Sequence, residues 1–379
     1  MIQPIYLDYN GTTPHDPEVI AAMEPFLTTH FGNPSSSHGY GVAPQQAVEK
    51  ARRQVADLLG CQSQEVIFTS GGTESNNQAV KSFGGTRFAQ GCHIITSAVE
   101  HPAILEVCRF MEGHGFSVTY LPVDADGLVD LADVAAAIRP ETILISIMHA
   151  NNEVGTLQPV DQIAGLARER GLLVHTDAAQ SLGKIPVRVD ELGVQLLSLA
   201  GHKIYAPKGI GALYSKKELT PQIFCHGAGQ ERGLRAGTEN VLGIVGLGMA
   251  CEIAGRDLKA HTARLRAMRD RLEEGIAASL PDVRFNGHRE QRLPNTASVS
   301  FYGLEADRIL EEIGLEVAAS AGAACHAGHV ALSHVLEAMR IPQAWAQGTV
   351  RFTTGRMTTT AEIDRALEVI VAAVKKLRG

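Results

Sequence analysis

The stretch Ser198-Leu199-Ala200-Gly201-His202-Lys203-Ile204-Tyr205 places a lysine just after a short apolar run that is typical of a buried strand. A lysine at the end of such a strand loses solvation, so its pKa falls and its amine becomes nucleophilic. An enzyme that forms a Schiff base needs such an amine. On residue type alone, a surface lysine after a strand is the more common case. The role of Lys203 therefore depends on what the rest of the chain supplies.

Short apolar runs alternate with helical patterns on both sides of this stretch. We expect strands at 66–69, 93–96, 118–121, 143–147, 172–175, 196–199 and 211–214. We expect helices at 43–59, at 73–83, from 102 onward, at 130–138 and at 161–169. This alternation predicts an α/β fold with a mostly parallel, seven-stranded sheet flanked by helices. Ligands of such sheets bind beyond the carboxyl ends of the strands, so the residues that follow the strands are the informative ones.

The C-terminal third of the chain has a different pattern. Residues 240–280 predict a long pair of helices that leaves the sheet. After this pair we expect strands at 297–301, 315–319 and 349–353, and helices at 305–313, 333–339 and 360–377. We therefore predict a large domain at 16–257 and a smaller α+β domain formed by 1–15 and 258–379.

The composition is that of an ordinary globular protein of 379 residues, with 45% hydrophobic and 20% charged residues. This length is enough for a large core and two domains. The chain shows neither a basic and apolar signal pattern at its start nor an apolar run near the roughly 20 residues that cross a bilayer. We therefore expect a cytoplasmic protein without a membrane partner. The net charge of -7 argues against a nucleic-acid partner.

One candidate phosphate site lies in Thr69-Ser70-Gly71-Gly72-Thr73-Glu74-Ser75-Asn76, where a strand, a glycine pair and a helix start follow one another. Free backbone N–H groups and the positive end of the helix dipole converge there, which suits a phosphate. Thr73 can add a hydroxyl donor, or it can simply cap its helix. The stretch is neither a GxxxxGK[ST] loop nor a GxGxxG fingerprint.

A second group of candidate residues follows the strand at 172–175. Asp177 comes 26 residues before Lys203, and Gln180 follows it closely. A carboxylate there could hold a protonated ring nitrogen, as a pyridoxal phosphate site requires, and Gln180 could hydrogen-bond a phenolic oxygen. Taken alone, Asp177 is equally well explained as a helix cap or a metal ligand.

Two further strands end in polar side chains. His101 follows the strand at 93–97 and could stack on a planar ring and move protons near neutral pH. Asn152 follows the strand at 143–147 and could point its amide into the same crevice. A lone histidine after a strand is more often a satisfied polar residue. Four strand ends that carry polar groups, together with a lysine, favour one shared site.

Nine motifs spread over nearly the whole chain share the pattern of a known group of enzymes. They are LDYNGTTP at 7–14, FGNPSSSH at 31–38, FTSGGTESNN at 68–77, VEHP at 99–102, HANNEVG at 149–155, HTDAAQ at 175–180, GHKIYAPKG at 201–209, GQERGLRAGTEN at 229–240 and SAGAACH at 320–326. With this set the chain resembles the fold-type I pyridoxal-phosphate enzymes of the class V aminotransferase group. Within that group it resembles the cysteine desulfurases and selenocysteine lyases.

The resemblance assigns a role to each candidate residue around the cofactor, pyridoxal 5'-phosphate. It implies that Lys203 forms the internal aldimine, Asp177 pairs with the pyridinium nitrogen, Gln180 holds the ring oxygen, His101 stacks on the ring, and Gly72, Thr73 and His202 hold the phosphate. The resemblance also implies a homodimer, in which the partner subunit's Thr238 completes the phosphate site. Asn152 and Arg351 would orient the cofactor and the substrate carboxylate, to which the planar fork of an arginine is well suited. Without the resemblance, a surface ion pair is the better explanation for Arg351.

The segment 320–329 is rich in small and polar residues, so a cysteine in it is not expected to be a core residue. The thiolate is the reactive form of Cys325, and His326 or His329 could lower its pKa. A metal site made of Cys325, His326, His329 and His334 is an alternative, although this spacing matches no zinc pattern. For the remaining cysteines we expect buried packing: Cys61, Cys92, Cys108, Cys225 and Cys251.

The resemblance makes Cys325 the catalytic cysteine. It implies that Lys203 removes the α-proton of the substrate and that the Cys325 thiolate attacks the substrate sulfur. The products would be L-alanine and a persulfide on Cys325, which is passed to a sulfur acceptor or scaffold protein for iron–sulfur clusters or other sulfur metabolism.

Two departures bear on the substrate, which the resemblance implies is L-cysteine or L-selenocysteine. Ala200 stands where the desulfurases that feed iron–sulfur scaffolds usually have a serine, and AGAACHA at 321–327 stands where they read SGSACTS. Both features resemble selenocysteine lyases, whereas SHVLEAM at 333–339 and the loop length before it resemble desulfurases. We expect a cysteine desulfurase, with selenocysteine lyase as the alternative. A docking protein without activity is a third hypothesis. Transamination would leave Cys325 without a task.

Overall fold

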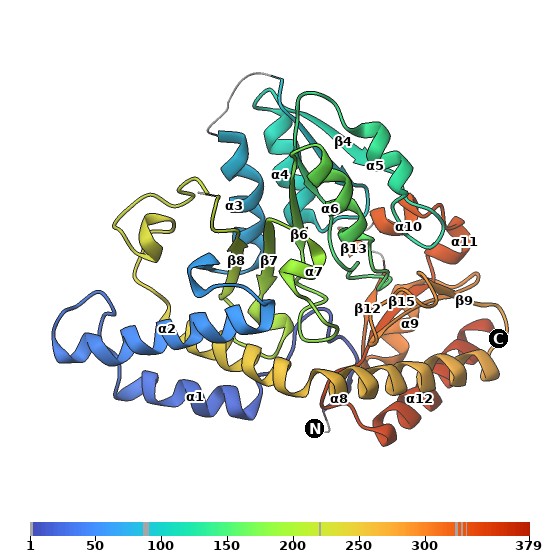
Figure 1. The fold of residues 1–379 in the computed structure, drawn as a ribbon. Coiled ribbons are helices and arrows are strands. Elements are labelled where there is room, and N and C mark those ends of the chain that lie inside the picture. The colour runs from blue at the N-terminus through green and yellow to red at the C-terminus, as the bar shows by residue number, and fades with distance from the viewer. Residues whose placement is uncertain (1–2, 86–90, 220, 323–324, 327–328, 331) are drawn as a thin grey trace.

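The computed structural model describes residues 3–85, 91–219, 221–322, 325–326, 329–330 and 332–379. Within these ranges, a seven-stranded sheet with the order β2-β8-β7-β6-β5-β3-β4 forms the centre of the molecule (Figure 1). Its strands are β2 (Val66–Thr69), β3 (His93–Ser97), β4 (Ser117–Leu121), β5 (Thr142–Ser146), β6 (Leu173–Asp177), β7 (Leu196–Ala200) and β8 (Gly211–Ser215). Only β8 runs antiparallel to its neighbours in this sheet. The predicted α/β class with a mostly parallel sheet is confirmed.

The sheet is buried on both faces, and its side chains alternate between two cores. Ile94 of β3 packs in a core with α3 (Gly72–Gly85) and α4 (Pro102–Glu112). The next residue, Ile95, packs in the core on the opposite face, with α2 (Gly39–Leu59) and α6 (Val160–Glu169). Successive side chains of a strand point to opposite faces, so continuous apolar runs are what a sheet covered on both sides requires. Three more helices complete this part: α1 (Pro17–Thr28), α5 (Leu131–Ala137) and α7 (Val189–Leu192).

A smaller sheet forms beside the first, with the order β12-β15-β10-β9. Its strands are β9 (Val283–Asn286), β10 (Thr296–Phe301), β12 (Ser320–Ala321) and β15 (Thr349–Thr353), and it packs with α9 (Ala306–Ile313) and α12 (Thr360–Arg378). The N-terminal strand β1 (Ile5–Tyr6) pairs with β11 (Val317–Ala318), and Leu7 lies in the core of this region. Both ends of the chain therefore contribute to it. The remaining elements are the hairpin of β13 (Cys325–His326) and β14 (His329–Val330), and the helices α10 (His334–Ala338) and α11 (Gln343–Ala346).

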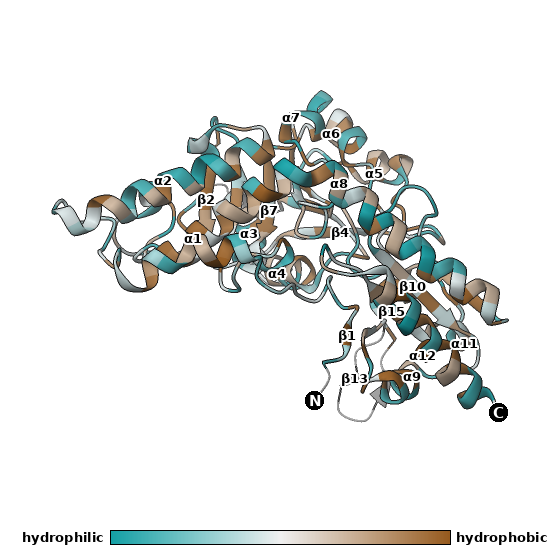
Figure 2. Cartoon of the chain, turned by 90° about the horizontal axis from the view of Figure 1, so that it is seen from below, coloured by the Kyte–Doolittle hydropathy of each residue, from teal (hydrophilic) through white to brown (hydrophobic). Residues whose placement is uncertain are grey.

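The predicted helix pair at 240–280 is wrong, because α8 (Val241–Ser279) is one continuous helix. In Figure 1 it runs below both sheets, from α1 and α2 to α12, and Figure 2 shows hydrophilic and hydrophobic stretches alternating along it. Its glycines permit close packing and do not interrupt it. A Cβ on Gly246 would lie 2.6 Å from Pro207 Cδ, and one on Gly248 would lie 2.6 Å from Ala51 Cα. Because α8 passes through residue 257, the division of the chain at that point remains a prediction.

The cysteines outside the 320–329 segment differ in their surroundings. Cys92, Cys108 and Cys251 are buried as expected, and Cys61 is half-buried. Cys225 is exposed, so its predicted burial is wrong. The reason is that it lies in an irregular surface segment between β8 and α8, and not in a helix or strand. Burial raises the pKa of the Cys108 and Cys251 thiols to about 12, which keeps them protonated.

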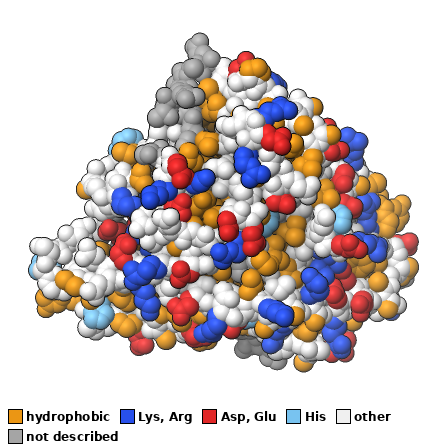
Figure 3. Space-filling model, viewed as in Figure 1, with side chains coloured by type: hydrophobic (Ala, Val, Ile, Leu, Met, Phe, Trp, Pro, Cys, Tyr) orange, Lys and Arg blue, Asp and Glu red, His pale blue; other side chains and the backbone are white. Residues whose placement is uncertain are grey.

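The surface carries charges of both signs. On the face shown in Figure 3, Lys and Arg side chains are interspersed with Asp and Glu side chains. Exposed ion pairs join Arg256 to Glu18 and Arg271 to Asp364. None of the helices in the described ranges is long and apolar enough to cross a membrane.

Candidate active site

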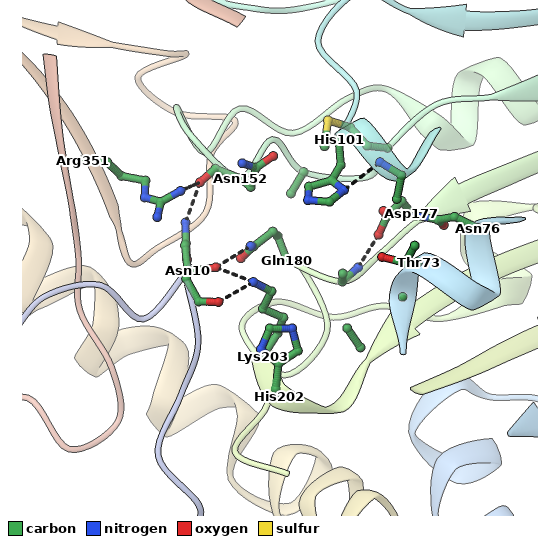
Figure 4. A pocket seen from close by; sticks show the side chains of 17 residues that line it. Asn10, Thr73, Asn76, His101, Asn152, Asp177, Gln180, His202, Lys203 and Arg351 are labelled. Carbon is green, nitrogen blue, oxygen red and sulfur yellow. Dashed lines mark hydrogen bonds between the residues drawn. The ribbon is translucent and has the colours of Figure 1, made fainter. Parts of the chain in front are cut away.

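A cavity of about 340 Å³ lies beyond the carboxyl ends of the central strands. The predicted residues that line it are Gly72, Thr73, His101, Asn152, Asp177, Gln180, His202, Lys203 and Arg351 (Figure 4). Asp177 is the last residue of β6, and Lys203 follows the end of β7. The parallel strands of an α/β sheet bring their ends to one edge, and this explains why residues so distant in sequence meet here.

Lys203 lies in a short turn, Gly201–Lys203, directly after β7. Its Nζ donates hydrogen bonds of 2.7 Å to the carbonyl oxygens of Asn10 and Gly11. Burial and, to a smaller extent, the nearby Arg351 cation lower the pKa of Lys203 to about 8, against the opposing effect of Asp8 and Asp177. A larger fraction of this amine is therefore neutral near physiological pH than of an ordinary lysine, as a nucleophilic amine requires.

The turn that carries Lys203 is braced by a strained residue. Tyr205 has φ of 71°, a left-handed conformation that is costly for a bulky side chain. Its backbone N–H donates to Thr13 Oγ1 at 2.9 Å, and its hydroxyl accepts from the backbone N–H of Arg356 at 2.7 Å. The Arg356 guanidinium also lies 3.8 Å from the centre of the Tyr205 ring. Residues near both ends of the chain thus hold this turn in place.

Asp177 presents a buried carboxylate to the cavity. One oxygen accepts a hydrogen bond of 2.7 Å from Asn76 Nδ2, and the other accepts one of 2.9 Å from the backbone N–H of Ala179. These bonds hold the carboxylate in one orientation, which suits recognition of a protonated ring nitrogen. The sequence reasoning did not place Asn76 in the site. The signal was present, because Asn76 lies one helical turn after Gly72 and Thr73 and so faces the same way.

His101 is the N-cap of α4, and this role fixes its ring. Its Nδ1 accepts a hydrogen bond of 3.1 Å from the backbone N–H of Ala103. In a neutral ring with Nδ1 as acceptor, the proton is on Nε2. Desolvation lowers the pKa of His101, and the Lys203 and His334 charges act in the same direction, whereas Asp177 opposes them. The ring is therefore neutral near physiological pH, in the form that stacks well on a planar group.

The phosphate end of the cavity is formed by the start of α3 at Gly72. The first N–H groups of a helix have no acceptor within it, and they form the positive end of the helix dipole. Thr73 lies within the first turn and not at the N-cap position. A Cβ on Gly72 would lie 3.3 Å from Ala200 Cβ, so glycine permits this close approach of the helix start to β7. Ala200 supplies a methyl group to the cavity wall where a serine would supply a hydroxyl.

His202 lies beside the phosphate end. Its Nδ1 is 3.1 Å from Thr12 Oγ1. Burial and, to a smaller extent, the Lys203 and Lys208 charges lower the pKa of His202 to about 4. His202 is thus a neutral hydrogen-bonding group and not a cation at physiological pH.

Arg351 projects from β15 toward the opposite end of the cavity. One terminal nitrogen forms an ion pair of 2.7 Å with Asp8, and the other donates to the carbonyl oxygen of Asn152 at 3.1 Å. Within the described part of the chain, the buried Nε of Arg351 has no hydrogen-bond partner. A buried donor without a partner is costly, so a carboxylate ligand that bonds to it would be favoured.

Asn10 is a second residue that the sequence reasoning missed, and it joins the parts of the site. Its backbone oxygen accepts from both Lys203 and Gln180 Nε2 (Figure 4). Its side-chain oxygen accepts from Lys184 and Asn295. The available signal was its place in LDYNGTTP, as a polar residue just beyond the first strand.

Two predicted residues lie elsewhere. Thr238 is exposed and lines a separate cavity beside β2. The segment that contains it is held by a buried, bidentate ion pair, in which the two Arg52 nitrogens lie 2.7 and 2.8 Å from the Glu231 carboxylate oxygens. Its predicted role in the partner's phosphate site remains a prediction. For Cys325 the structure describes the backbone, paired in the β13–β14 hairpin, and its side chain lies outside the description. The same holds for His326 and His329 of the alternative metal site.

The sequence profile of the aminotransferase class-V family matches residues 5–366. The chain belongs to the class-V aminotransferase family. A cysteine desulfurase IscS from Dictyoglomus turgidum is 48% identical over 379 residues, which cover 100% of this chain and 96% of that protein. The structure of a NifS-like protein superposes with a TM-score of 0.93 at 37% identity, covering 99% of this chain and 100% of the other. The structure of SspA in complex with cysteine superposes with a TM-score of 0.81 at 37% identity, covering 93% and 99%. The resemblance predicted from the motifs is confirmed.

The class-V aminotransferase family uses pyridoxal phosphate, and the residues of this cavity fit that group. The helix start at Gly72 offers N–H donors for a phosphate, Asp177 offers a carboxylate for a ring nitrogen, and Lys203 offers an amine for an aldehyde. Asn76, which bonds to Asp177, also lines the cavity, and its buried Oδ1 atom has no hydrogen-bond partner among the described residues. These residues therefore match the phosphate, the ring nitrogen and the aldehyde of the cofactor.

Proposed function

We propose that this protein is a pyridoxal-phosphate-dependent cysteine desulfurase that converts L-cysteine into L-alanine and leaves a persulfide on Cys325. The observation that carries the proposal is the joint placement of Lys203 and Asp177 in one cavity, with the pKa of the lysine lowered to about 8. The names of the relatives, which include cysteine desulfurases at 48% identity, support the substrate. The cysteine bound in the related SspA structure supports it too.

In this proposal seven of the residues that line the cavity hold the cofactor. Lys203 binds the aldehyde carbon, Asp177 the ring nitrogen, His101 the ring face and Gln180 the phenolic oxygen, while Gly72, Thr73 and His202 hold the phosphate. When bound, pyridoxal phosphate supplies an electron sink that makes the Cα proton of an amino acid labile. The chemistry at the substrate's other atoms falls to the protein's own side chains.

Arg351 and Lys203 act on the substrate itself. The substrate carboxylate would bond to the Nε of Arg351, with Asn152 beside it. Lys203, as a free amine, takes the Cα proton, and a pKa of about 8 suits a general base near neutral pH. In the structure its Nζ donates to two carbonyl oxygens, and these bonds hold the amine at one side of the cavity.

Cys325 takes the sulfur. Its thiolate attacks the substrate sulfur, so that an S–S bond forms and the Cβ–S bond breaks. The electron pair of the broken bond remains with carbon, which is protonated at Cβ, and the proton that Lys203 took returns to Cα to give L-alanine. The sulfur is oxidised to the persulfide level and carbon is reduced, so the step needs no external oxidant. The homodimer with Thr238 in the partner's site, the acceptor of the sulfur and a cytoplasmic location remain predictions.

The experiment is to load the purified protein with pyridoxal phosphate and measure its visible absorbance and alanine release from L-cysteine. We expect a yellow protein whose absorbance is lost in Lys203→Ala and whose alanine release is abolished in Cys325→Ala. A protein that stays colourless would support the hypothesis of a docking protein without activity. Full activity of Cys325→Ala on cysteine would show that another group is the nucleophile.

Selenocysteine lyase is the second candidate. It is favoured by Ala200, whose methyl group lines the cavity near Gly72 in place of a hydroxyl donor. Turnover of L-cysteine and L-selenocysteine, compared on one preparation of the enzyme, distinguishes the two. We expect substantial turnover of cysteine. Turnover confined to selenocysteine would favour the second candidate.

A further inference from the structure

A second lysine, Lys184, is buried behind the cavity. Lys184 is 6% exposed, and its Nζ donates to Gln180 Oε1 at 2.8 Å and to Asn10 Oδ1 at 2.9 Å. Gln180 is four residues earlier, in the turn that follows Asp177. Lys184 is not among the residues that line the cavity, whereas both of its bonding partners are. The lysine therefore acts on the cavity through these two amides.

The surroundings of Lys184 are unusual for a buried lysine. The two bonds that the structure gives its amine go to neutral amide oxygens, and not to a carboxylate. Burial lowers its pKa well below the ordinary value, and the Lys203 and Arg351 charges lower it further. A buried amine in such a place is costly, so an explanation by stability alone is weak.

Of its two partners, Gln180 depends more on Lys184 than Asn10 does. The side chain of Asn10 is also held by Asn295, which donates to its oxygen at 3.0 Å, and by its own Nδ2, which donates to Thr296 Oγ1 at 2.9 Å. The Gln180 amide has one bond at each end: its oxygen accepts from Lys184, and its nitrogen donates to the Asn10 carbonyl at 3.0 Å. Loss of Lys184 would release one end of the Gln180 amide, and the Asn10 side chain would remain fixed.

This arrangement determines which atom Gln180 offers to a ligand. An amide nitrogen has two donors. For Gln180 Nε2, the acceptor that the described residues supply is the Asn10 carbonyl, which leaves one N–H for a ligand in the cavity. With the amide oxygen held on Lys184, the group that faces the cavity is a donor and not an acceptor.

We propose that Lys184 is a positioning residue that orients the Gln180 amide so that its free N–H bonds to the phenolic oxygen of pyridoxal phosphate. This inference rests on the proposed function, since it requires that cofactor. It assigns to Lys184 a role in cofactor recognition, through Gln180, without direct contact.

The test measures binding to the apoenzyme by absorbance titration, with pyridoxal phosphate and with 3-deoxypyridoxal phosphate, which lacks the phenolic oxygen. We expect Lys184→Met to weaken binding of pyridoxal phosphate about tenfold, the size of one hydrogen bond, and to leave binding of the deoxy analogue within about twofold. A role in folding alone would weaken both ligands equally. An equal loss for both ligands, or no loss for either, would overturn the proposal.

A second comparison uses Gln180→Met and the double variant with Lys184→Met. Lys184→Met alone leaves the buried Gln180 oxygen without a donor. The double variant has no such oxygen, so it can fold even where the single Lys184 variant does not. We expect the double variant to bind pyridoxal phosphate as Gln180→Met does, because Lys184 acts through Gln180. A further loss of affinity in the double variant would contradict the proposal. Failure of the wild-type protein to bind pyridoxal phosphate would overturn the proposed function and this inference together, and a result confined to the variants concerns Lys184 alone.

Discussion

Lys184 is buried and Lys203 is half-buried, and both bond to Asn10, but they do so in different ways. Lys203 donates to the backbone oxygens of Asn10 and Gly11 and lines the cavity. Lys184 donates to side-chain amide oxygens and lies behind the cavity wall. Burial lowers the pKa of both amines. The difference shows that a depressed pKa makes a lysine a candidate nucleophile only where an open cavity faces its amine.

The largest expected effect distinguishes the reacting lysine from the positioning lysine. Lys203→Ala should lower alanine formation from L-cysteine by about 10³-fold or more, because it removes both the general base and the amine that binds the cofactor. Lys184→Met should lower it far less, since Lys184 touches neither substrate nor cofactor. The measurement is alanine release at saturating pyridoxal phosphate. Equal losses in the two variants would show that this division of roles is wrong.

The next effect concerns the pKa of Lys203, which Arg351 lowers and Asp8 raises. Arg351→Met removes the cation and leaves Asp8 without its ion pair, and both changes favour the protonated amine. The pKa of Lys203 should therefore rise above its present value of about 8. The rate at which the apoenzyme captures pyridoxal phosphate should then reach half its maximum at a higher pH, because only the neutral amine attacks the aldehyde.

The control for this experiment is Arg271→Met, which removes an exposed arginine that pairs with Asp364 on α12. It should leave the midpoint of capture unchanged, because charges at the surface are screened. A midpoint that falls or stays constant in Arg351→Met would show that Arg351 does not set the pKa of Lys203.

A smaller effect concerns the strained turn after Lys203. Tyr205→Phe keeps the ring under Arg356 but removes the hydroxyl that accepts from the Arg356 backbone N–H. Loss of this buried acceptor should lower the free energy of unfolding by about 1 to 3 kcal/mol, measured by urea denaturation of the apoprotein. An unchanged stability would mean that the Arg356 contact with the ring and the backbone bond to Thr13 hold the left-handed conformation of Tyr205 without the hydroxyl.

The two lysines also mark how far sequence reasoning reaches. Lys203, Asp177, His101 and Asn152 could be predicted because each lies at or beyond the end of a strand of a mostly parallel sheet, and the ends of such strands meet. Lys184 follows no strand and belongs to none of the quoted motifs. Its importance comes from burial against Asn10, a contact across 174 positions of the chain. Only the folded structure reveals such a contact.

The same limit explains the errors in the fold. The alternation of strands and helices in the first part is a local pattern, and it predicted the central sheet correctly. The pair of helices expected within 240–280 is one helix, in which Gly246 and Gly248 allow close packing against Pro207 and α2. Whether a glycine ends a helix or allows a neighbour to approach depends on tertiary contacts that the local sequence does not contain.

The smallest effect is expected from substitution of a lysine that is neither buried nor bonded to side-chain amides. Lys216 is exposed and lies 3.8 Å from Glu218 in a surface ion pair. Lys216→Gln should change the free energy of unfolding by less than about 0.5 kcal/mol, because exposed ion pairs are solvated and screened. It should also leave the affinity of the apoenzyme for pyridoxal phosphate within about twofold, in contrast to the tenfold loss expected for Lys184→Met. A loss at Lys216 as large as that at Lys184 would show that a general loss of positive charge, and not the orientation of the Gln180 amide, weakens cofactor binding.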